Sequence, residues 1–207
     1  YDVVLSKEFN INVADNGVVV PEENFITLDL NGYTLTAGSE QKKNILVLGQ
    51  LTIKDSRTAG CIKCATDYSG PATGFGVIMA RGENAKVIVN GGTIDAVRDN
   101  PVSKGQFAVT LNEGADFEIN GGKIIAGWYA VCGNGSYKTQ NTLITVNAGI
   151  LESTADYALY LPQSGSTVIN DGATVTGGAG AICIRSGNLT INGGNIVCEG
   201  DGNTGET

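Results

Sequence analysis

Short runs of alternating apolar and polar residues recur along this chain, and the same turn-forming phrase interrupts each run. The phrase reads Val-Asn-Gly-Gly-Thr-Ile at residues 89–94, returns at 119–124, 146–151 and 191–196, and has a divergent copy at 30–35. Alternation with a period of two on both sides of a tight turn is typical of two short β-strands that meet at a corner. The pattern therefore predicts a repeated strand–corner–strand unit.

Seven copies of this unit follow one another when the chain is aligned on the corner position. Five copies carry an Asn there, Lys54 replaces it in one copy, and residues 167–175 form a slipped copy; the five are Asn31, Asn90, Asn120, Asn147 and Asn192. A third apolar strand lies between successive copies, and no segment shows the apolar spacing of a helix. Copies about 22 to 35 residues apart suit the turns of a solenoid. We predict an all-β fold, a right-handed parallel β-helix of about seven three-strand rungs.

In such a fold, equivalent residues of successive rungs stack in columns. One predicted core column contains Leu46, Val77, Val109, Val131, Leu159 and Ile182. At the corner, Asn tolerates a positive φ and Gly adopts it freely, while stacked Asn side chains can hydrogen-bond from rung to rung. A phosphate-binding glycine loop would need a helix after it, and none is predicted. We therefore interpret the Asn-Gly-Gly phrase as an architectural asparagine ladder.

We divide the chain into three parts on this basis. Residues 1–24 do not fit the rung pattern and are predicted to form an N-terminal cap or an irregular first coil. Residues 25–198 form the parallel β-helix, and residues 199–207 are a polar tail or the start of a continuation. Because no apolar residue follows Cys198, the last rung is expected to stay open, and an open solenoid end favours stacking into a homo-oligomer unless it is capped.

The rungs resemble the right-handed parallel β-helix, or pectate-lyase-like, superfamily. More narrowly, "ITLDLNGYTLT", "LTIKDS" and the "GGTI" rungs are similar to repeat regions of gut-bacterial cell-surface proteins and of phage fibre or spike proteins. The resemblance implies an extracellular, cell-surface or virion-surface location. It also implies an adhesin-like or virion-appendage-like module that binds a receptor or glycan or serves as a rigid stalk. The superfamily also contains polysaccharide lyases and glycoside hydrolases, so a loop-borne catalytic site is the alternative.

Charge narrows the range of partners. The 207 residues include 13 Lys and Arg, 21 Asp and Glu and no His, for a net charge of −8. Such a chain repels nucleic acid and anionic lipid, and no apolar run is long enough for a membrane span. We therefore predict no nucleic-acid partner and no membrane insertion. The absence of His removes the commonest general base and transition-metal ligand, and we expect no cofactor.

Catalytic chemistry finds little support in the third strand. Its predicted outward columns hold neither a carboxylate nor a base; they are Gly76, Ala108, Ala130, Ala158 and Ala181, and then Val47, Ile78, Thr110, Cys132, Tyr160 and Cys183. Enzymes of the superfamily that the rungs resemble place their catalytic groups on such a face. The weak alternative is a loop site made of Asp95, Arg98 and Asp99, although charged loop residues are usually only solvated.

The five cysteines do not suggest a metal site. In a strand, Cys61 and Cys64 point to opposite faces, and no second pair is present to complete a zinc site. We expect free thiols, with Cys64 and Cys198 in the core.

Aromatic residues give the candidate binding site. Trp128, Tyr137 and Tyr160 are predicted to be surface residues that contact a glycan or a protein receptor, because aromatic rings offer apolar area beside polar groups. Four other aromatics at equivalent positions are predicted to form a stacked ladder inside the repeat: Phe75, Phe107, Tyr129 and Tyr157.

Overall fold

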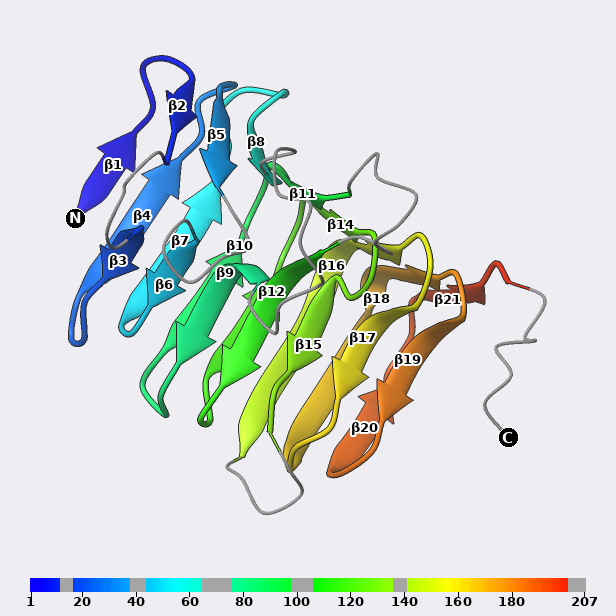
Figure 1. Cartoon of the computed structure of the whole chain (residues 1–207). Coiled ribbons are helices and arrows are strands. Elements are labelled where there is room, and N and C mark those ends of the chain that lie inside the picture. The colour runs from blue at the N-terminus through cyan, green and yellow to red at the C-terminus, as the bar shows by residue number, and fades with distance from the viewer. Residues whose placement is uncertain (12–16, 38–43, 65–75, 98–105, 136–140, 201–207) are drawn as a thin grey trace.

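The protein is a parallel β-solenoid with every described strand paired parallel to its neighbours (Figure 1). The computed structural model describes residues 1–11, 17–37, 44–64, 76–97, 106–135 and 141–200. Within these ranges the regular elements are all β-strands, and no helix is found. The predicted all-β, parallel β-helical fold class is therefore confirmed.

Each turn of the solenoid has up to three legs. The first leg precedes the corner and is formed by β1 (Asp2–Val4), β4 (Phe25–Asp29), β7 (Gln50–Lys54), β10 (Lys86–Val89), β13 (Asp116–Ile119) and β20 (Asn188–Ile191). The second follows the corner and is formed by β2 (Phe9–Asn10), β5 (Thr34–Ala37), β8 (Cys61–Cys64), β11 (Thr93–Ala96), β14 (Lys123–Ala126) and β21 (Asn195–Cys198). Two longer strands, β16 (Thr142–Ser153) and β18 (Gly165–Gly177), run through the corner and join these legs into one sheet.

The third leg builds a second sheet of seven strands along the same axis. In spatial order from the N-terminal end these are β3 (Val18–Val20), β6 (Ile45–Val47), β9 (Gly76–Arg81), β12 (Phe107–Asn112), β15 (Val131–Gly133), β17 (Tyr157–Leu161) and β19 (Gly180–Ile184). β1 and β21 lie at opposite ends of the stack (Figure 1).

The predicted number of three-strand rungs was too high. The structure has about five turns built from three separate strands, from β1–β3 to β13–β15, rather than seven. In the two turns after them the corner no longer interrupts the ladder, because β16 and β18 pair on both sides of it with only a register shift between Val146 and Ala148. A bulge of this kind bends a strand without ending it.

Two alignments made from the sequence were also wrong. Asp29, not Asn31, pairs with Lys54 and so holds the corner position of its turn. In the second sheet, Ile45 and Ile78 stack with Val109, whereas Leu46 and Met79 stack with Thr110. The core column is therefore Ile45, Ile78, Val109, Val131, Leu159 and Ile182, and the adjacent column contains Leu46, Met79, Thr110, Cys132, Tyr160 and Cys183.

Aliphatic columns fill the interior of the solenoid. One column runs from Leu28 through Ile53, Val89, Ile119 and Val146 to Ile169, and its members are 0 to 8% exposed. Burial of one such side chain contributes about 1.5–3 kcal/mol. The solenoid is thus held together by hydrophobic stacking along its axis as well as by the parallel backbone ladders.

The first turn already follows the solenoid register. β1 pairs with β4, β2 with β5 and β3 with β6. No helix in the described part of the chain is long and apolar enough to cross a membrane.

Candidate functional site

Four aromatic side chains gather on three successive turns at the edge of the second sheet. Phe107 begins β12, Trp128 and Tyr129 lie just before β15, and Tyr160 lies in β17. Because β12, β15 and β17 are neighbouring parallel strands, residues distant in the sequence become adjacent along the rod. All four side chains are partly buried. We call this group the aromatic cluster.

The rings of the aromatic cluster differ in how much of their faces the neighbours cover. Tyr129 stacks on Phe107, with centroids 5.1 Å apart and planes 14° apart, and on Tyr160, at 4.9 Å and 11°. Trp128 is tilted instead, by 51° to Phe107 and 37° to Tyr129. Offset and tilted contacts are the arrangements that ring quadrupoles favour. Tyr129 is therefore covered by a nearly parallel ring on each side. Trp128 is not part of this parallel stack, and Tyr160 is the last ring in it.

Polar groups fix the two outer rings of the cluster. The Nε1 of Trp128 donates a hydrogen bond to the Asp156 carboxylate, whose other oxygen accepts one from the Tyr157 backbone N–H at 2.9 Å. At the other edge, the Arg185 Nη1 donates to the Tyr160 hydroxyl at 3.2 Å. Burial, and next the negative charge of Asp156, raises the pKa of Tyr129 above its usual value. The tyrosine hydroxyl thus stays neutral in ordinary conditions.

The cluster can therefore offer apolar ring area next to a carboxylate and a guanidinium. Such a combination suits a sugar, whose C–H faces pack on rings while its hydroxyls bond to charged groups. Among the described residues of the cluster and its hydrogen-bond partners, Asp156 is the one carboxylate. Glycoside hydrolysis uses two carboxyl groups on opposite sides of the bond, and the described part of the cluster contributes one of them.

The predicted site residues have different outcomes. Trp128 and Tyr160 both contact Tyr129 and so belong to one cluster. Tyr137 lies outside the described residues, as do Arg98 and Asp99. Asp95 lies on the other sheet, in β11, where it is partly buried and accepts a hydrogen bond from the Val97 N–H at 2.9 Å. The structure gives Asp95 a local turn contact and does not bring it to the aromatic cluster.

The aromatic ladder predicted inside the repeat exists only in part. Phe107 and Tyr129 stack as expected, but Tyr160 continues the stack where Tyr157 was predicted. Tyr157 instead packs its ring over Gly180, where an added Cβ would lie 2.5 Å from the ring. Phe75 lies outside the described residues, and Gly76 is the residue that pairs with Phe107.

The corner phrase forms the asparagine ladder. Asn120 Nδ2 donates to Asn90 Oδ1 at 2.9 Å, and Asn147 donates to Asn120 at 2.8 Å. The series continues from Asn170 to Asn147 at 2.7 Å and from Asn192 to Asn170 at 2.8 Å. Asn120, Asn147 and Asn170 each donate to the turn before and accept from the turn after, so one residue type can repeat along the ladder. These contacts tie each corner of the ladder to the next one along the axis.

Only the second glycine of the Asn-Gly-Gly phrase needs a left-handed backbone. Gly92, Gly122, Gly149 and Gly194 have φ between 82° and 94°. The residue before this glycine is Ala148 in the copy at 146–151, which is consistent with a backbone conformation that does not require glycine at that position. The corner Asn residues of the ladder do not adopt a positive φ, contrary to the expectation from sequence.

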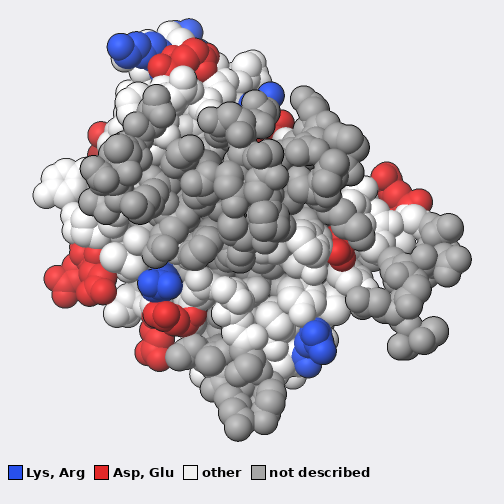
Figure 2. All heavy atoms as spheres, in the orientation of Figure 1, with Lys and Arg blue, Asp and Glu red and all other residues white. Residues whose placement is uncertain are grey.

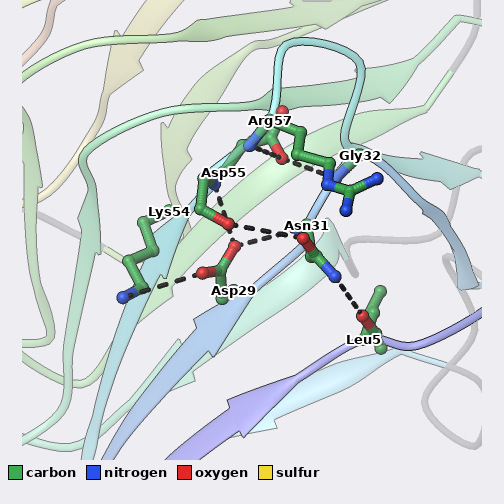
Figure 3. A network of polar contacts seen from close by, with 8 residues as sticks. Leu5, Asp29, Asn31, Gly32, Lys54, Asp55 and Arg57 are labelled. Carbon is green, nitrogen blue, oxygen red and sulfur yellow. Dashed lines mark hydrogen bonds and ion pairs between the residues drawn. The ribbon is translucent and has the colours of Figure 1, made fainter.

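Carboxylates replace the amide ladder at the N-terminal corners (Figure 3). Asp55 Oδ1 accepts hydrogen bonds from the N–H groups of Gly32 at 2.7 Å and Arg57 at 3.3 Å, and its Oδ2 accepts one from Gly60 at 2.7 Å. Asp29 Oδ1 accepts from the N–H groups of Asn31 and Ser56, and Lys54 Nζ lies 3.7 Å from Asp29 Oδ2. These contacts, led by the Ser56 hydrogen bond, lower the pKa of Asp29. The carboxylates bind their own backbone and act as turn supports.

None of the five cysteines forms a disulfide, as expected from their spacing. Cys61 is partly exposed and Cys64 is buried, so the two residues do face opposite sides of β8. Cys198 is exposed, contrary to the prediction that it lies in the core, because it belongs to the last described turn. Burial, followed by the Asp95 charge, raises the pKa of Cys61 to about 11. Within the described ranges, no group of three or more acidic, Cys or His side chains is placed to hold a metal ion.

Charged side chains do not form a large patch of one sign on the face that Figure 2 shows. The visible Lys, Arg, Asp and Glu residues lie in small separate groups. Two ion pairs of 2.7 Å, between Lys86 and Glu118 and between Lys123 and Glu152, link neighbouring turns. Exposed pairs of this kind each contribute about 1 kcal/mol or less.

Sequence reasoning did not find Asp156 and Arg185, the polar partners of the cluster. A signal for Asp156 was available, because it follows Trp128 by 28 residues, the same distance that separates Tyr129 from Tyr157. Residues one turn apart lie next to each other along the solenoid axis, so Asp156 could have been predicted to lie beside Trp128. Arg185 has no such signal, since its long side chain reaches back to the preceding turn.

Comparison with protein-family models, with curated proteins and with solved structures finds no match for this chain. The parallel β-solenoid fold therefore rests on the chain's own strand pairing.

Proposed function

We propose that this protein is a non-catalytic β-helical module of a cell or virion surface that binds a glycan through the aromatic cluster. The observation that carries the proposal is that Trp128 and Tyr160 both pack on Tyr129 beside the second sheet, with Asp156 and Arg185 bonded to their polar edges. The adhesin-like and phage-appendage-like resemblance of the rungs supports the same role.

The ring geometry favours Trp128 as the main contact. Its indole is partly buried and tilted to both neighbouring rings, so it is not sandwiched between parallel rings as Tyr129 is. Its hydrogen bond to Asp156 holds the indole in one orientation before a ligand arrives. Such pre-organisation lowers the entropy cost of binding. Tyr160 contributes a second apolar surface one turn along the rod.

A glycan array followed by calorimetry on the best ligand tests the proposal. We expect Trp128→Ala to weaken binding at least about tenfold, as removal of a central aromatic anchor usually does. Trp128→Phe keeps a ring but loses the bond to Asp156, and we expect a smaller loss. Tyr33→Ala is the matched control, because Tyr33 is also partly buried but lies at the second corner of the chain, away from the cluster.

The same samples distinguish the competing functions. Release of reducing ends from pectin or mucin glycans would identify a polysaccharide lyase or glycoside hydrolase and overturn the proposal. Absence of both binding and cleavage would leave the rigid stalk as the remaining role. Equal melting temperatures of wild type and the Trp128 variants are required before a loss of binding is assigned to the site.

A further inference from the structure

Exposed apolar side chains concentrate at the two ends of the solenoid. Twelve large hydrophobic residues are exposed in the described part of the chain. Seven of them lie at or before residue 25, three lie in the last described turn, and two, Leu143 and Ile150, lie along the side. An end of a parallel solenoid also leaves one row of backbone N–H and C=O groups without a neighbouring strand. Both ends therefore have the features of an unfilled interface.

Several of the exposed end residues are members of the same core columns. Val3 begins the column that passes through Leu28 and Ile53 and finishes at Ile191. Val3 is 45% exposed and Ile191 53%, whereas the members between them are 0 to 8% exposed. A second column begins at Phe9, which is 46% exposed, and finishes at Ile196, which is 37% exposed. Each column thus lacks one neighbour at each end.

The N-terminal end is also hollow. An apolar hollow of about 310 Å³ is lined by ten residues, all of them apolar: Val3, Leu5, Phe9, Val18, Val20, Ile26, Leu28, Leu35, Ile45 and Leu51. The surrounding β1, β2 and β3 are the terminal strands of their sheets. Apolar side chains from another solenoid turn would fill this hollow and gain the burial that inner turns already have.

We propose that a second copy of this chain covers the hollow by stacking head to tail. In this arrangement the β20 and β21 edge of one copy pairs with the β1 and β2 edge of the next. Every turn of the solenoid offers one edge to the turn before it and the opposite edge to the turn after it, and all pairs are parallel. Head-to-tail stacking continues that pattern, with Ile191 over Val3 and Ile196 over Phe9.

The size of the end face is adequate for such a contact. Successive turns are 22 to 36 residues apart, as Leu189 lies 22 residues after Thr167 and Val87 lies 36 after Leu51. A stable interface uses about 20–30 residues on each side. Contact between two N-terminal ends would instead make the strands antiparallel and bring Asp2 and Glu8 against the same residues of the partner. The head-to-tail contact is heterologous and does not close, so oligomers should grow beyond the dimer.

Sedimentation of the 207-residue chain over a concentration series is the test, with one charged substitution at each end. Val3→Asp blocks the N-terminal face only, and Ile191→Asp blocks the C-terminal face only. We expect wild type to form a concentration-dependent series of oligomers and each variant alone to sediment as a monomer. An equimolar mixture of the two variants should form a dimer and nothing larger, because one intact face of each kind remains. Ile150→Asp, on the side of the rod, should behave like wild type.

Three results would overturn the proposal. A wild-type chain that stays monomeric at all concentrations would show that the ends do not associate. Dimers of Ile191→Asp that Val3→Asp does not form would show pairing of two N-terminal faces. Variants that retain wild-type folding by circular dichroism but do not dimerise when mixed would exclude the head-to-tail contact. A variant that does not fold is replaced by Val3→Thr or Ile191→Thr, for which the same mixing result is required.

Discussion

This solenoid has two kinds of corner, and a different side chain makes the hydrogen bonds that hold the chain in each of them. From Asn90 onward the corner is short and its side chain is an uncharged amide that bonds to the turn before and the turn after. At the first corners the chain between paired strands is longer, and Asp29 and Asp55 accept the backbone N–H groups of the loop. Paired positions 53 and 62 are nine residues apart at the longer corner, whereas 89 and 94 are five apart.

The comparison indicates that the length of the corner determines whether an Asn amide or an Asp carboxylate suits it. A short corner leaves few backbone N–H groups that need an acceptor. An Asn amide can therefore use its own donor and acceptor groups to bond to the same residue type in the neighbouring turns, and this pattern can repeat along the rod. A longer corner exposes several N–H groups at once, and an acceptor-only carboxylate with two oxygens can serve them all. Asp55 alone accepts three such bonds. The amides of the ladder do not titrate, whereas the carboxylate corner carries titratable groups.

The largest effect on this comparison is expected from Gly122→Ala in the short corner. Gly122 has a φ of 87°, and an added Cβ would lie 2.5 Å from the Gly92 carbonyl oxygen. Backbone strain and overpacking together should lower the free energy of unfolding by about 2–4 kcal/mol. Urea unfolding measures the loss.

Gly91→Ala provides the control from the same phrase. Its added Cβ would meet its nearest atom at 3.5 Å, and its backbone is not left-handed. We expect a change within about 0.5 kcal/mol. Equal losses for the two variants would contradict the conclusion that only the last glycine of the phrase is required.

A smaller effect is expected from Asn120→Ala in the asparagine ladder. The substitution removes the bonds to Asn90 and Asn147 and one to Glu118. Since Asn120 is exposed, water partly replaces these bonds, and we expect a loss of about 1–2 kcal/mol. Asn192→Ala, at the end of the ladder, should cost about half as much. No change in melting temperature for Asn120→Ala would mean that the ladder does not stabilise the corner.

The smallest effect is a pH dependence that belongs to the carboxylate corner. The pKa of Asp29 is lowered in the fold from its ordinary 3.8. Its stabilising contribution is therefore complete above that value and is lost as the pH falls through the lower folded pKa. The stability advantage of wild type over Asp29→Asn should thus shrink between pH 7 and pH 3, measured by urea unfolding. The cost of Asn147→Ala, whose amide bonds to Asn120 and Asn170 rather than to a carboxylate, should stay constant over the same range, and a parallel decline in both would remove the distinction between the corners.

The sequence by itself determined the solenoid and the asparagine ladder. Alternation with a period of two around a repeated Asn-Gly-Gly phrase is a local property, and it specified strands, corners and stacking together. The alternation pattern did not determine the strand-pairing register where the copies of the phrase diverge. Asn31 was aligned with Lys54 although Asp29 pairs there, because a slip of two residues leaves every side chain on the same face and the apolar pattern unchanged.

Only the tertiary structure decided which residues meet across turns. The runs at 45–48 and 76–80 are nearly continuous in apolar residues, so no alternation indicated whether Ile45 or Leu46 faces the core. The aromatic cluster depends on the same choice, since Tyr160 rather than Tyr157 reaches Tyr129. Strand pairing between residues 22 to 36 positions apart fixes these contacts, and that pairing is set by packing of the whole stack rather than by any local stretch of the chain.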